Sequence, residues 1–395
     1  MNILALNCGS SSVKFKLIRF DVDGCPRELA SGLVEEVGSG ASLFRYVGID
    51  GEPSVERVRA LDHEAAVRLV LDALTAPRRG PLEGLSEIAA VGHRVVHGGA
   101  EFRKAVLVDD AVREAIGRCS ALAPLHNPHN LRGIELARAL LPGVPQVAVF
   151  DTAFHQSMPP EASTYALPEE TRSELGIRRY GFHGISHAYV ARRAAEELGR
   201  PPGALRIVTC HLGNGASVAA VKGGRSVDTS MGMTPLEGLV MGTRCGDLDP
   251  AVVLLMVTDG HLTPDDVDRL LNERSGLLGL SGASNDMREV IERSADDSRA
   301  ELALEVFCYR VRKYIGAYTA ALGGIDALVF TGGIGENEPE VRARACRGLD
   351  FLGVLLDDGA NERGAVRIGA GSVAVLVLGT DEELAIAMEA HGLVT

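Results

Sequence analysis

Two short segments combine glycine with small polar residues in a way that suits phosphate binding. Residues 3–13 and 207–217 each read as an apolar strand, a glycine turn and a second alternating strand. Small residues let backbone N–H groups approach an anion closely, although an ordinary hairpin turn has a similar composition. The two copies lie about half the chain apart, which favours two structurally related domains. A pair of phosphate-binding turns would imply a nucleotide ligand.

Lysine is rare in the chain, and two lysines follow the first turn. Besides Lys14 and Lys16, the residue occurs only at positions 104, 222 and 313. A lysine just after a glycine and serine turn is a plausible phosphate contact. Residues two apart share one face of a strand, so the sequence does not choose between Lys14 and Lys16.

A third glycine segment, residues 331–339, follows the apolar run 327–330 and precedes a helical pattern after Pro339. Free N–H groups at a helix start suit phosphate or nucleotide binding. The segment lacks the Gly-Lys-Ser/Thr of a Walker A loop and the Gly-x-Gly-x-x-Gly of a dinucleotide fold. A P-loop NTPase and an NAD enzyme are therefore disfavoured.

Three charged residues stand where they could meet a ligand. Asp151 follows the apolar run 146–150 directly, at the carboxyl end of a strand, where open α/β sheets bind ligands. A helix cap or turn is the alternative for this aspartate. Arg94 and Arg244 lie among glycine and small residues and could clamp a carboxylate or phosphate in bidentate fashion, with surface ion pairing as the alternative.

Two pairs of histidines have a spacing that could indicate a metal site. His93 and His97 form one pair, and His183 and His187 form the other. The zinc-protease pattern is absent because no glutamate follows the first histidine. Hydrogen-bonded structural histidines are the alternative for both pairs.

The elements that must position these residues follow an α/β pattern. Short apolar runs alternate with amphipathic stretches and are separated by glycine. The expected strands include residues 88–96, 147–150, 207–210, 327–330 and 373–378. The expected helices include residues 63–74, 130–140, 187–198 and 300–322.

Length and charge narrow the class of protein. The 395 residues suit two or three domains. The net charge is -13 and basic runs do not exceed pairs, which argues against a nucleic-acid or anionic-membrane partner. The longest apolar stretches, 251–257 and 373–378, fall short of the ~20 residues of a membrane-spanning helix.

The first residues and the cysteines bear on location. Residues 1–6 lack a basic region and a long apolar core, so we expect no secretory signal. Seven cysteines without any Cys-x-x-Cys suit a reducing compartment and no structural zinc. We therefore expect a cytoplasmic protein.

Read together, the motifs resemble the acetokinase family, within the acetate and sugar kinase, chaperone and actin superfamily. The matching segments are NCGSSS at 7–12, GHRVVHGG at 92–99, FDTAFHQ at 150–156, YGFHGISH at 180–187, HLGNGAS at 211–217, DTSMGMTPLEG at 228–238, TRCGDLDP at 243–250, GGIGEN at 332–337 and TDEEL at 380–384. Cys245 and Gly332 stand where serine and alanine would be more usual, and these departures leave the assignment intact.

The resemblance implies a fold and a reaction. The fold would be α/β, with duplicated actin-like (ribonuclease H-like) domains, mixed sheets flanked by helices, and ATP in the cleft between them. Residues 1–152 with 383–395 would form the N-terminal domain and residues 153–382 the nucleotide-binding domain. The reaction would be reversible Mg²⁺- or Mn²⁺-dependent phosphoryl transfer from ATP to acetate by direct in-line displacement, giving acetyl phosphate and ADP. A homodimer is also implied.

The resemblance also implies roles for single residues. Asn7 and Glu382 would hold the metal, Arg94 would bind the carboxylate, and Asp151 would act beside the metal and the nucleophile. Arg244 and His183 would stabilise the transferring phosphoryl group. The acetate methyl pocket would be lined by Val96, Leu125, Phe182 and Pro235, with His126 nearby. The residues that hold ATP would be Lys14, His211, Leu212, Gly213, Asn214, Gly215, Asp286, Met287, Arg288, Gly333, Ile334, Gly335, Glu336 and Asn337.

Elementary chemistry agrees with these roles. A carboxylate substrate is ionised at neutral pH and needs no strong general base. The site must instead supply cations that bring two anions together and neutralise a loose transition state. A sugar kinase would need a pocket that reads hydroxyl groups, and an actin-like or chaperone-type protein would lack the arginines. Propionate kinases and other short-chain acid kinases remain the main alternatives.

Overall fold

The computed structural model describes all 395 residues, which form two compact units. The first unit comprises Met1–Phe154 and Asp381–Thr395, and the second comprises His155–Thr380. The boundaries expected from the sequence, after residues 152 and 382, lie two residues from these. The chain thus leaves the first unit once and returns to it with its last helix.

The first unit is built on one eight-stranded sheet. Its elements are β1 (Asn2–Cys8), β2 (Val13–Phe20), β3 (Pro26–Glu35), β4 (Ser42–Val47), β5 (Pro53–Val58), α1 (His63–Leu74), β6 (Ile88–Val95), β7 (Val106–Leu107), α2 (Asp110–Arg118), α3 (Asn127–Leu140), β8 (Gln146–Phe150) and α15 (Glu382–Val394). The strand order is β5-β4-β3-β2-β1-β6-β8-β7. The sheet is mixed, because β1, β6 and β8 run parallel while the β1–β4 meander is antiparallel.

Side chains of successive strand residues point to opposite faces of the sheet, so this unit has buried side chains on both faces. Leu4 and Leu6 of β1 are buried in the cluster that includes residues of α1 and α3. Gly92 of β6 faces α15, where an added Cβ would lie 2.6 Å from Cγ2 of Ile386. Glycine at this position therefore lets α15 pack closely on the strand.

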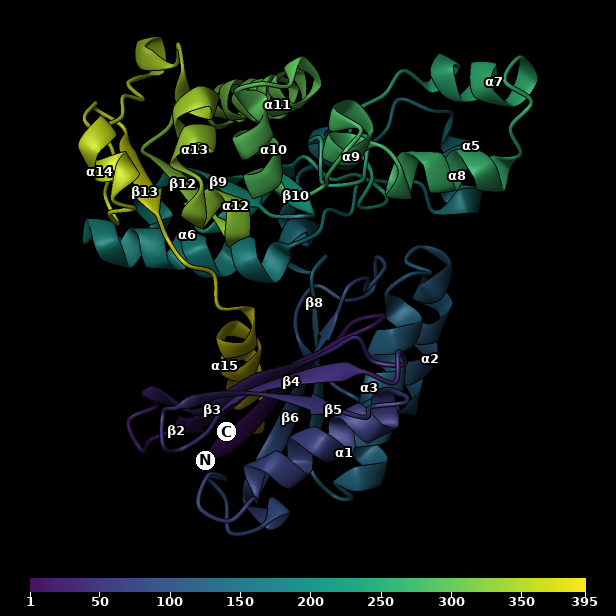
Figure 1. The fold of residues 1–395 in the computed structure, drawn as a ribbon, viewed down its shortest axis with the longest axis vertical. Coiled ribbons are helices and arrows are strands. Elements are labelled where there is room, and N and C mark those ends of the chain that lie inside the picture. The colour runs from purple at the N-terminus through teal and green to yellow at the C-terminus, as the bar shows by residue number, and fades with distance from the viewer. The chain divides into compact units, whose positions relative to one another are not determined.

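The second unit is built on one five-stranded sheet. Its elements are α4 (Pro160–Ser163), α5 (Glu169–Leu175), α6 (Gly184–Leu198), β9 (Arg206–Leu212), β10 (Ala216–Lys222), β11 (Arg225–Thr229), α7 (Pro250–Thr258), α8 (Pro264–Glu273), α9 (Gly276–Ser281), α10 (Met287–Ser294), α11 (Ser298–Leu322), β12 (Ala327–Thr331), α12 (Gly332–Asn337), α13 (Pro339–Cys346), α14 (Asp358–Glu362) and β13 (Ala374–Val377). The strand order is β11-β10-β9-β12-β13. Figure 1 shows α6 on one face of this sheet and α11 and α13 on the other.

The two sheets share one topology. In the first unit β3, β2, β1, β6 and β8 are joined by two antiparallel pairings and then two parallel ones. In the second unit β11, β10, β9, β12 and β13 follow the same order and directions. The internal similarity seen in the sequence therefore reflects a duplicated α/β fold, with mixed sheets flanked by helices.

The expected strands and helices are all present, and the differences lie at their ends. The helices expected at 130–140 and 187–198 begin three residues earlier, as α3 and α6. The apolar periodicity starts late in both, because α3 opens with Asn127 and Pro128 in its first turn and α6 opens with a glycine. No helix has the length and apolar character needed to cross a membrane. All seven cysteines are free thiols.

Candidate active site

Three of the predicted residues meet at the carboxyl ends of neighbouring strands in the first unit. Leu6 of β1 pairs with His93 of β6, so the next residues, Asn7 and Arg94, stand side by side. Val95 pairs with Phe150, the last residue of β8, and Asp151 follows directly. The parallel pairing of β1, β6 and β8 thus brings Asn7, Arg94 and Asp151 to one edge of the sheet.

Arg94 and Asp151 form a bidentate ion pair. Nε of Arg94 donates to Oδ1 of Asp151 at 3.1 Å and Nη2 donates to Oδ2 at 2.7 Å. The Asp151 side chain is 1% exposed and that of Arg94 is 20% exposed. Burial lowers the pKa of Arg94, but the charges of Asp151 and Glu382 outweigh it and raise the pKa above the ordinary value. Arg94 therefore stays a cation, and its Nη1 makes no hydrogen bond in the structure.

Two asparagines of α3 hold the backbone around this ion pair. Asn130 accepts from the backbone N–H of Val96 at 3.0 Å and donates to the carbonyl of Cys8 at 2.8 Å. Asn127 accepts from the N–H of His97 at 3.0 Å and donates to its carbonyl at 2.9 Å. The sequence analysis did not identify these residues. Their only sequence signal is the presence of two amides in the first turn of an otherwise amphipathic helix.

The N-terminus of α15 brings three consecutive carboxylates to the first unit. Asp381 caps the helix by accepting from the N–H of Leu384 at 2.9 Å. Glu382 places Oε2 3.7 Å from Nε of Arg94. Glu383 is 1% exposed and its Oε2 lies 2.8 Å from Nζ of Lys14. Carboxylates in the first turn also interact favourably with the helix dipole.

The same helix end distinguishes the two lysines. Lys16 lies 2.8 Å from both Asp381 and Glu28 and its side chain is 18% exposed. The Lys14 side chain is 50% exposed and contacts one carboxylate. Lys16 thus holds α15 against β2, whereas Lys14 is the lysine that can reach a ligand.

In the second unit, the glycine turn between β9 and β10 lies beside both predicted phosphoryl-stabilising residues. An ideal Cβ on Gly215 would lie 3.4 Å from Nε2 of His183 and 3.7 Å from Nη1 of Arg244. His183 precedes α6 with a φ of +56°, a conformation that non-glycine residues rarely adopt. Its ring stacks on that of His211, with centroids 4.3 Å apart. His183 and Arg244 therefore converge on the turn.

Arg244 carries a charge that no carboxylate of the structure neutralises. Nη1 donates to the carbonyl of Pro235 at 3.4 Å, and no ion pair involves this arginine. Burial lowers the pKa of Arg244, but a guanidinium stays protonated in proteins. A partly buried, uncompensated cation beside a glycine turn suits an anionic ligand.

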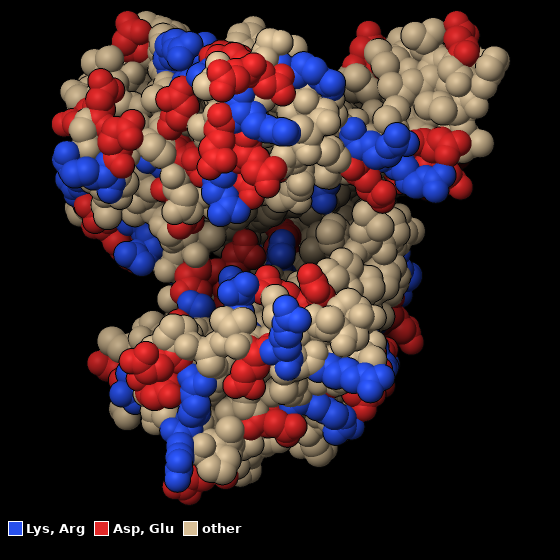
Figure 2. All heavy atoms as spheres, in the orientation of Figure 1, with Lys and Arg blue, Asp and Glu red and all other residues tan.

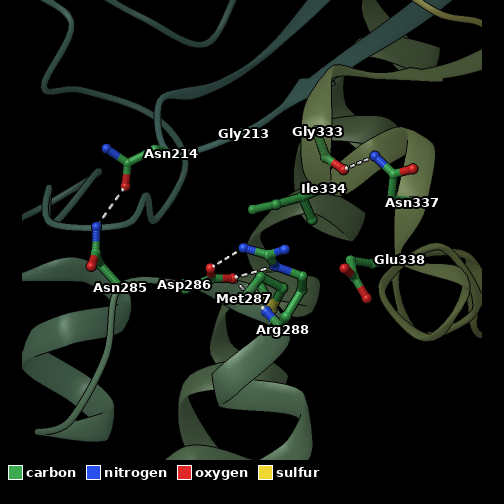
Figure 3. A pocket seen from close by; sticks show the side chains of 10 residues that line it. All are labelled: Gly213, Asn214, Asn285, Asp286, Met287, Arg288, Gly333, Ile334, Asn337 and Glu338. Atoms are coloured by element: carbon green, nitrogen blue, oxygen red, sulfur yellow. Dashed lines mark hydrogen bonds and ion pairs between the residues drawn. The ribbon is translucent and has the colours of Figure 1, made fainter. Parts of the chain in front are cut away.

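A pocket of about 500 Å³ opens next to the same turn (Figure 3). Its lining residues come from the β9–β10 turn, the start of α10 and α12, and they are Gly213, Asn214, Asn285, Asp286, Met287, Arg288, Gly333, Ile334, Asn337 and Glu338. Asp286 caps α10 and accepts from Nη2 of Arg288 at 2.6 Å. Asn285 and Glu338 were not identified from the sequence, and Glu338 makes no side-chain hydrogen bond in Figure 3.

The other predicted ATP-binding residues do not line this pocket. Leu212 is fully buried beneath the turn. Glu336 accepts from the N–H of Gly332 at 2.9 Å and from that of Thr380 at 3.2 Å, so its carboxylate ties two backbone segments together. The segment after Thr331 is also not an open loop, because α12 begins at Gly332. Gly332 has a φ of +77°, and an added Cβ would lie 2.7 Å from the carbonyl oxygen of Leu212.

The predicted methyl-pocket residues differ in exposure. Val96 and Phe182 are 7% and 1% exposed, whereas Leu125 is 54% exposed. Val96, Leu125 and His126 belong to the first unit, and Phe182 and Pro235 to the second. His126 stands immediately before α3.

The remaining histidines of the two pairs have structural partners. Nε2 of His93 lies 2.7 Å from Oε1 of Gln146, and burial lowers the pKa of His93 to about 4. His187 is fully buried and is hydrogen-bonded through both ring nitrogens. No group of three or more His, Cys, Asp or Glu side chains is arranged to hold a metal ion by itself.

Comparison with known proteins agrees with the fold. The family model of the acetokinase family matches residues 2–388. The acetate kinase of Halothermothrix orenii is 52% identical over 98% of both chains. The crystal structure of Porphyromonas gingivalis acetate kinase is 45% identical, covers 100% of both chains and gives a TM-score of 0.91. A propionate kinase structure from Francisella tularensis is 41% identical over 99% of both chains, with a TM-score of 0.92.

The duplicated α/β fold together with these relatives defines the class of protein, a phosphotransferase with a carboxyl group as acceptor. Within that class, the chain belongs to the acetokinase family.

Proposed function

We propose that the chain catalyses reversible phosphoryl transfer from ATP to acetate, giving acetyl phosphate and ADP by direct in-line displacement. The observation that carries the proposal is the Arg94–Asp151 ion pair, which fixes a cation and leaves Nη1 without a partner. A single planar guanidinium edge suits a small carboxylate. The acetokinase relatives at about half identity support acetate as the acceptor.

The residue roles follow from what the reaction needs. Acetate arrives as an anion, so Arg94 binds its carboxylate and Asp151 keeps that arginine in place. Arg244 and His183 stabilise the charge on the transferring phosphoryl group, because both face Gly215. Preorganised cations of this kind replace the general base that a hydroxyl substrate would require.

ATP is held mainly by the second unit. The pocket of about 500 Å³ receives the nucleotide, with Asp286 and Arg288 on one wall and Gly333 and Asn337 on the other. The N–H groups of the turn 213–215 approach the phosphates. Lys14 of the first unit supplies a further cation.

The residues expected at the metal site fit a magnesium ion. Asn7 offers an amide oxygen and Glu382 a carboxylate, the hard ligands that Mg²⁺ or Mn²⁺ prefers. Mg²⁺ is usually held by one or two protein carboxylates together with substrate phosphates, which agrees with the lack of a larger acidic cluster. When bound, the ion would neutralise phosphate charge. The chain's part is to orient it through Asn7 and Glu382.

A homodimer is supported by α7. No residue of this nine-residue helix is buried, and Leu254 and Leu255 are 67% and 56% exposed. Figure 2 shows a broad uncharged surface over α7. A second copy of the chain would cover this face. Sedimentation velocity should show a dimer that Leu254→Glu disrupts. Leu302→Glu, at a leucine that is 55% exposed elsewhere in the chain, should leave the dimer intact.

Seven free thiols are consistent with the proposed cytoplasmic location.

Acyl phosphate formation tests the proposed reaction. With ATP, Mg²⁺ and a series of short-chain acids, hydroxylamine should trap acetyl phosphate faster than propionyl or butyryl phosphate. Chelation should stop the reaction, and Mg²⁺ or Mn²⁺ should restore it. A faster reaction with propionate would favour the propionate kinase alternative, which the Francisella structure illustrates. Absence of any trapped product would contradict the proposal.

A further inference from the structure

A buried chain of hydrogen bonds runs from β9 to His183 within the second unit. Nδ1 of His183 lies 2.9 Å from Oγ of Ser217, and Nε2 of His187 lies 2.8 Å from the same oxygen. Nδ1 of His187 lies 2.8 Å from Oγ1 of Thr209. His187, Ser217 and Thr209 are all 0% exposed. The two histidines stand one helical turn apart on the same face at the start of α6, so Ser217 can bridge them.

The hydrogens of this chain can be assigned from simple counting. A hydroxyl carries one hydrogen, so Ser217 can donate to only one of the two imidazoles. Burial lowers the pKa of His187 well below its usual value, and the nearby His155 and His211 lower it further. His187 is therefore neutral and has one N–H. The Thr209 hydroxyl is directed at the carbonyl of Ala219 at 3.5 Å, so it accepts from Nδ1 of His187.

We infer that Ser217 and His187 are positioning residues that keep Nδ1 of His183 protonated and fix the orientation of its ring. Nδ1–H of His183 donates to Ser217, the Ser217 hydroxyl donates to Nε2 of His187, and Nδ1–H of His187 donates to Thr209. The inference goes beyond the role proposed for His183 and rests on that role only for its effect on turnover. Neither positioning residue needs to touch a substrate.

This arrangement leaves Nε2 of His183 to meet the ligand, and Nε2 can donate to a phosphoryl oxygen when the ring carries both protons. With Nδ1 tied to Ser217, Nε2 is directed to Gly215, 3.4 Å from the place of an added Cβ, on the same side as Arg244. A flip of the ring would exchange the two nitrogens and break the bond to Ser217. The relay also helps to hold His183 in its left-handed conformation, which non-glycine residues rarely adopt.

Removal of the Ser217 hydroxyl tests the effect on turnover. Ser217→Ala should lower kcat about 10- to 100-fold, as loss of a group that orients a reactive residue commonly does, with the KM for ATP and acetate nearly unchanged. Ser217→Thr keeps the hydroxyl and should recover part of the loss. The matched control is Ser226→Ala, because Ser226 is also 0% exposed and its Oγ lies 2.7 Å from another buried histidine, His155.

A purely structural role would give Ser217→Ala and Ser226→Ala the same small change in kcat and a similar loss of thermal stability, and that outcome would overturn the inference. Nitrogen-15 NMR of the histidine-labelled, ligand-free chain supplies a second test. Nδ1 of His183 should be protonated in the wild type, with its signal assigned by loss in His183→Gln. An unprotonated Nδ1 would also overturn the inference. A protonated Nδ1 with near-normal turnover of His183→Gln would instead support the relay and contradict the proposed role of His183 in catalysis.

Discussion

The carboxyl ends of the two sheets occupy equivalent positions of a duplicated fold, yet they carry different chemistry. Strand pairing places Asn7 beside Lys14 and, in the second unit, His211 beside Ser217. The same registers align Arg94 with Thr331 and Asp151 with Thr380. The first edge is thus rich in charge, whereas the second is built from neutral hydrogen-bonding side chains and glycine.

The cations of the second unit come from outside its sheet. His183 precedes α6, and Arg244 lies in the segment between β11 and α7. Arg244 forms no ion pair with a carboxylate, in contrast to Arg94, which is compensated by Asp151 and Glu382. Duplication therefore supplies two similar sheets whose charge balance differs, which agrees with the proposal that the first binds a carboxylate and a metal ion and the second binds phosphates.

The largest expected effect separates the two arginines. Arg94→Ala and Arg244→Ala should each lower kcat/KM about 10²–10³-fold, because each removes a donor to developing or bound negative charge. Arg94→Ala should raise the KM for acetate, whereas Arg244→Ala should act mainly on kcat. Steady-state kinetics with acetate and ATP varied separately would measure this difference, and near-wild-type constants for both would contradict the mechanism.

The free energy of unfolding should also differ between the two arginine variants. Arg94→Ala leaves the buried Asp151 without its bidentate partner, which can cost about 3–5 kcal/mol. Arg244→Ala removes a partly buried charge that has no carboxylate partner and should leave the free energy of unfolding unchanged or raised. Arg45→Ala, which breaks an exposed pair with Glu35, is the control and should cost at most about 1 kcal/mol. Equal losses in the two active-site variants would refute the difference in charge balance.

Acidification should weaken the second unit more than the first. Burial lowers the pKa of His93 in the first unit and His155 in the second to about 4, and that of His187 further still. The unfolded chain binds these protons near pH 6.5 and the folded chain only near pH 4 or below, so stability falls as the pH drops through that window, by up to a few kcal/mol per histidine. Hydrogen exchange at pH 7 and pH 5 should show the larger loss of protection in β9 and α6. Equal losses of protection in β6 and β9 would contradict the prediction that acid weakens the second unit more.

Much of the fold and several site residues could be predicted from the sequence, because they depend on local patterns. Alternation and glycine marked both hairpins, and the position of Asp151 after an apolar run placed it at a strand end. Contacts between distant residues could not be read in this way. Asn130 reaches the carbonyl of Cys8 across 122 positions, and the partners of Ser217 become apparent only when α6 lies on β9 and β10. Residue types alone did not choose between Lys14 and Lys16; the family resemblance pointed to Lys14, and only the structure shows their different contacts with the carboxylates of α15.

A substitution at the glycine turn tests whether the second edge is shaped for a ligand. Gly215→Ala places a methyl group at ordinary contact distance from His183 and Arg244, 3.4 and 3.7 Å away. The protein should fold with unchanged stability, but the methyl would occupy the space proposed for phosphate. We expect kcat/KM for ATP to fall about tenfold or more. Gly203→Ala, at a glycine with open space around it, is the control. Normal kinetics of Gly215→Ala would remove the turn from the site.

The smallest expected effect concerns the acid that the first edge selects. Val96 is 7% exposed, and Asn130 fixes its backbone N–H at 3.0 Å. If its side chain faces the acyl group, Val96→Ala removes two methyl groups there and should raise the ratio of kcat/KM for propionate to that for acetate. One methylene in an apolar pocket is worth about 1–3 kcal/mol, so the change should not exceed about 10–200-fold. Activity on acetate should persist, because Arg94 and Asp151 are untouched. If Val96 instead only packs the strand end, the ratio stays constant while the melting temperature falls. Measuring both quantities in Val96→Ala and in Val91→Ala, a buried valine of β6, the strand that Val96 follows, separates substrate selection from core packing.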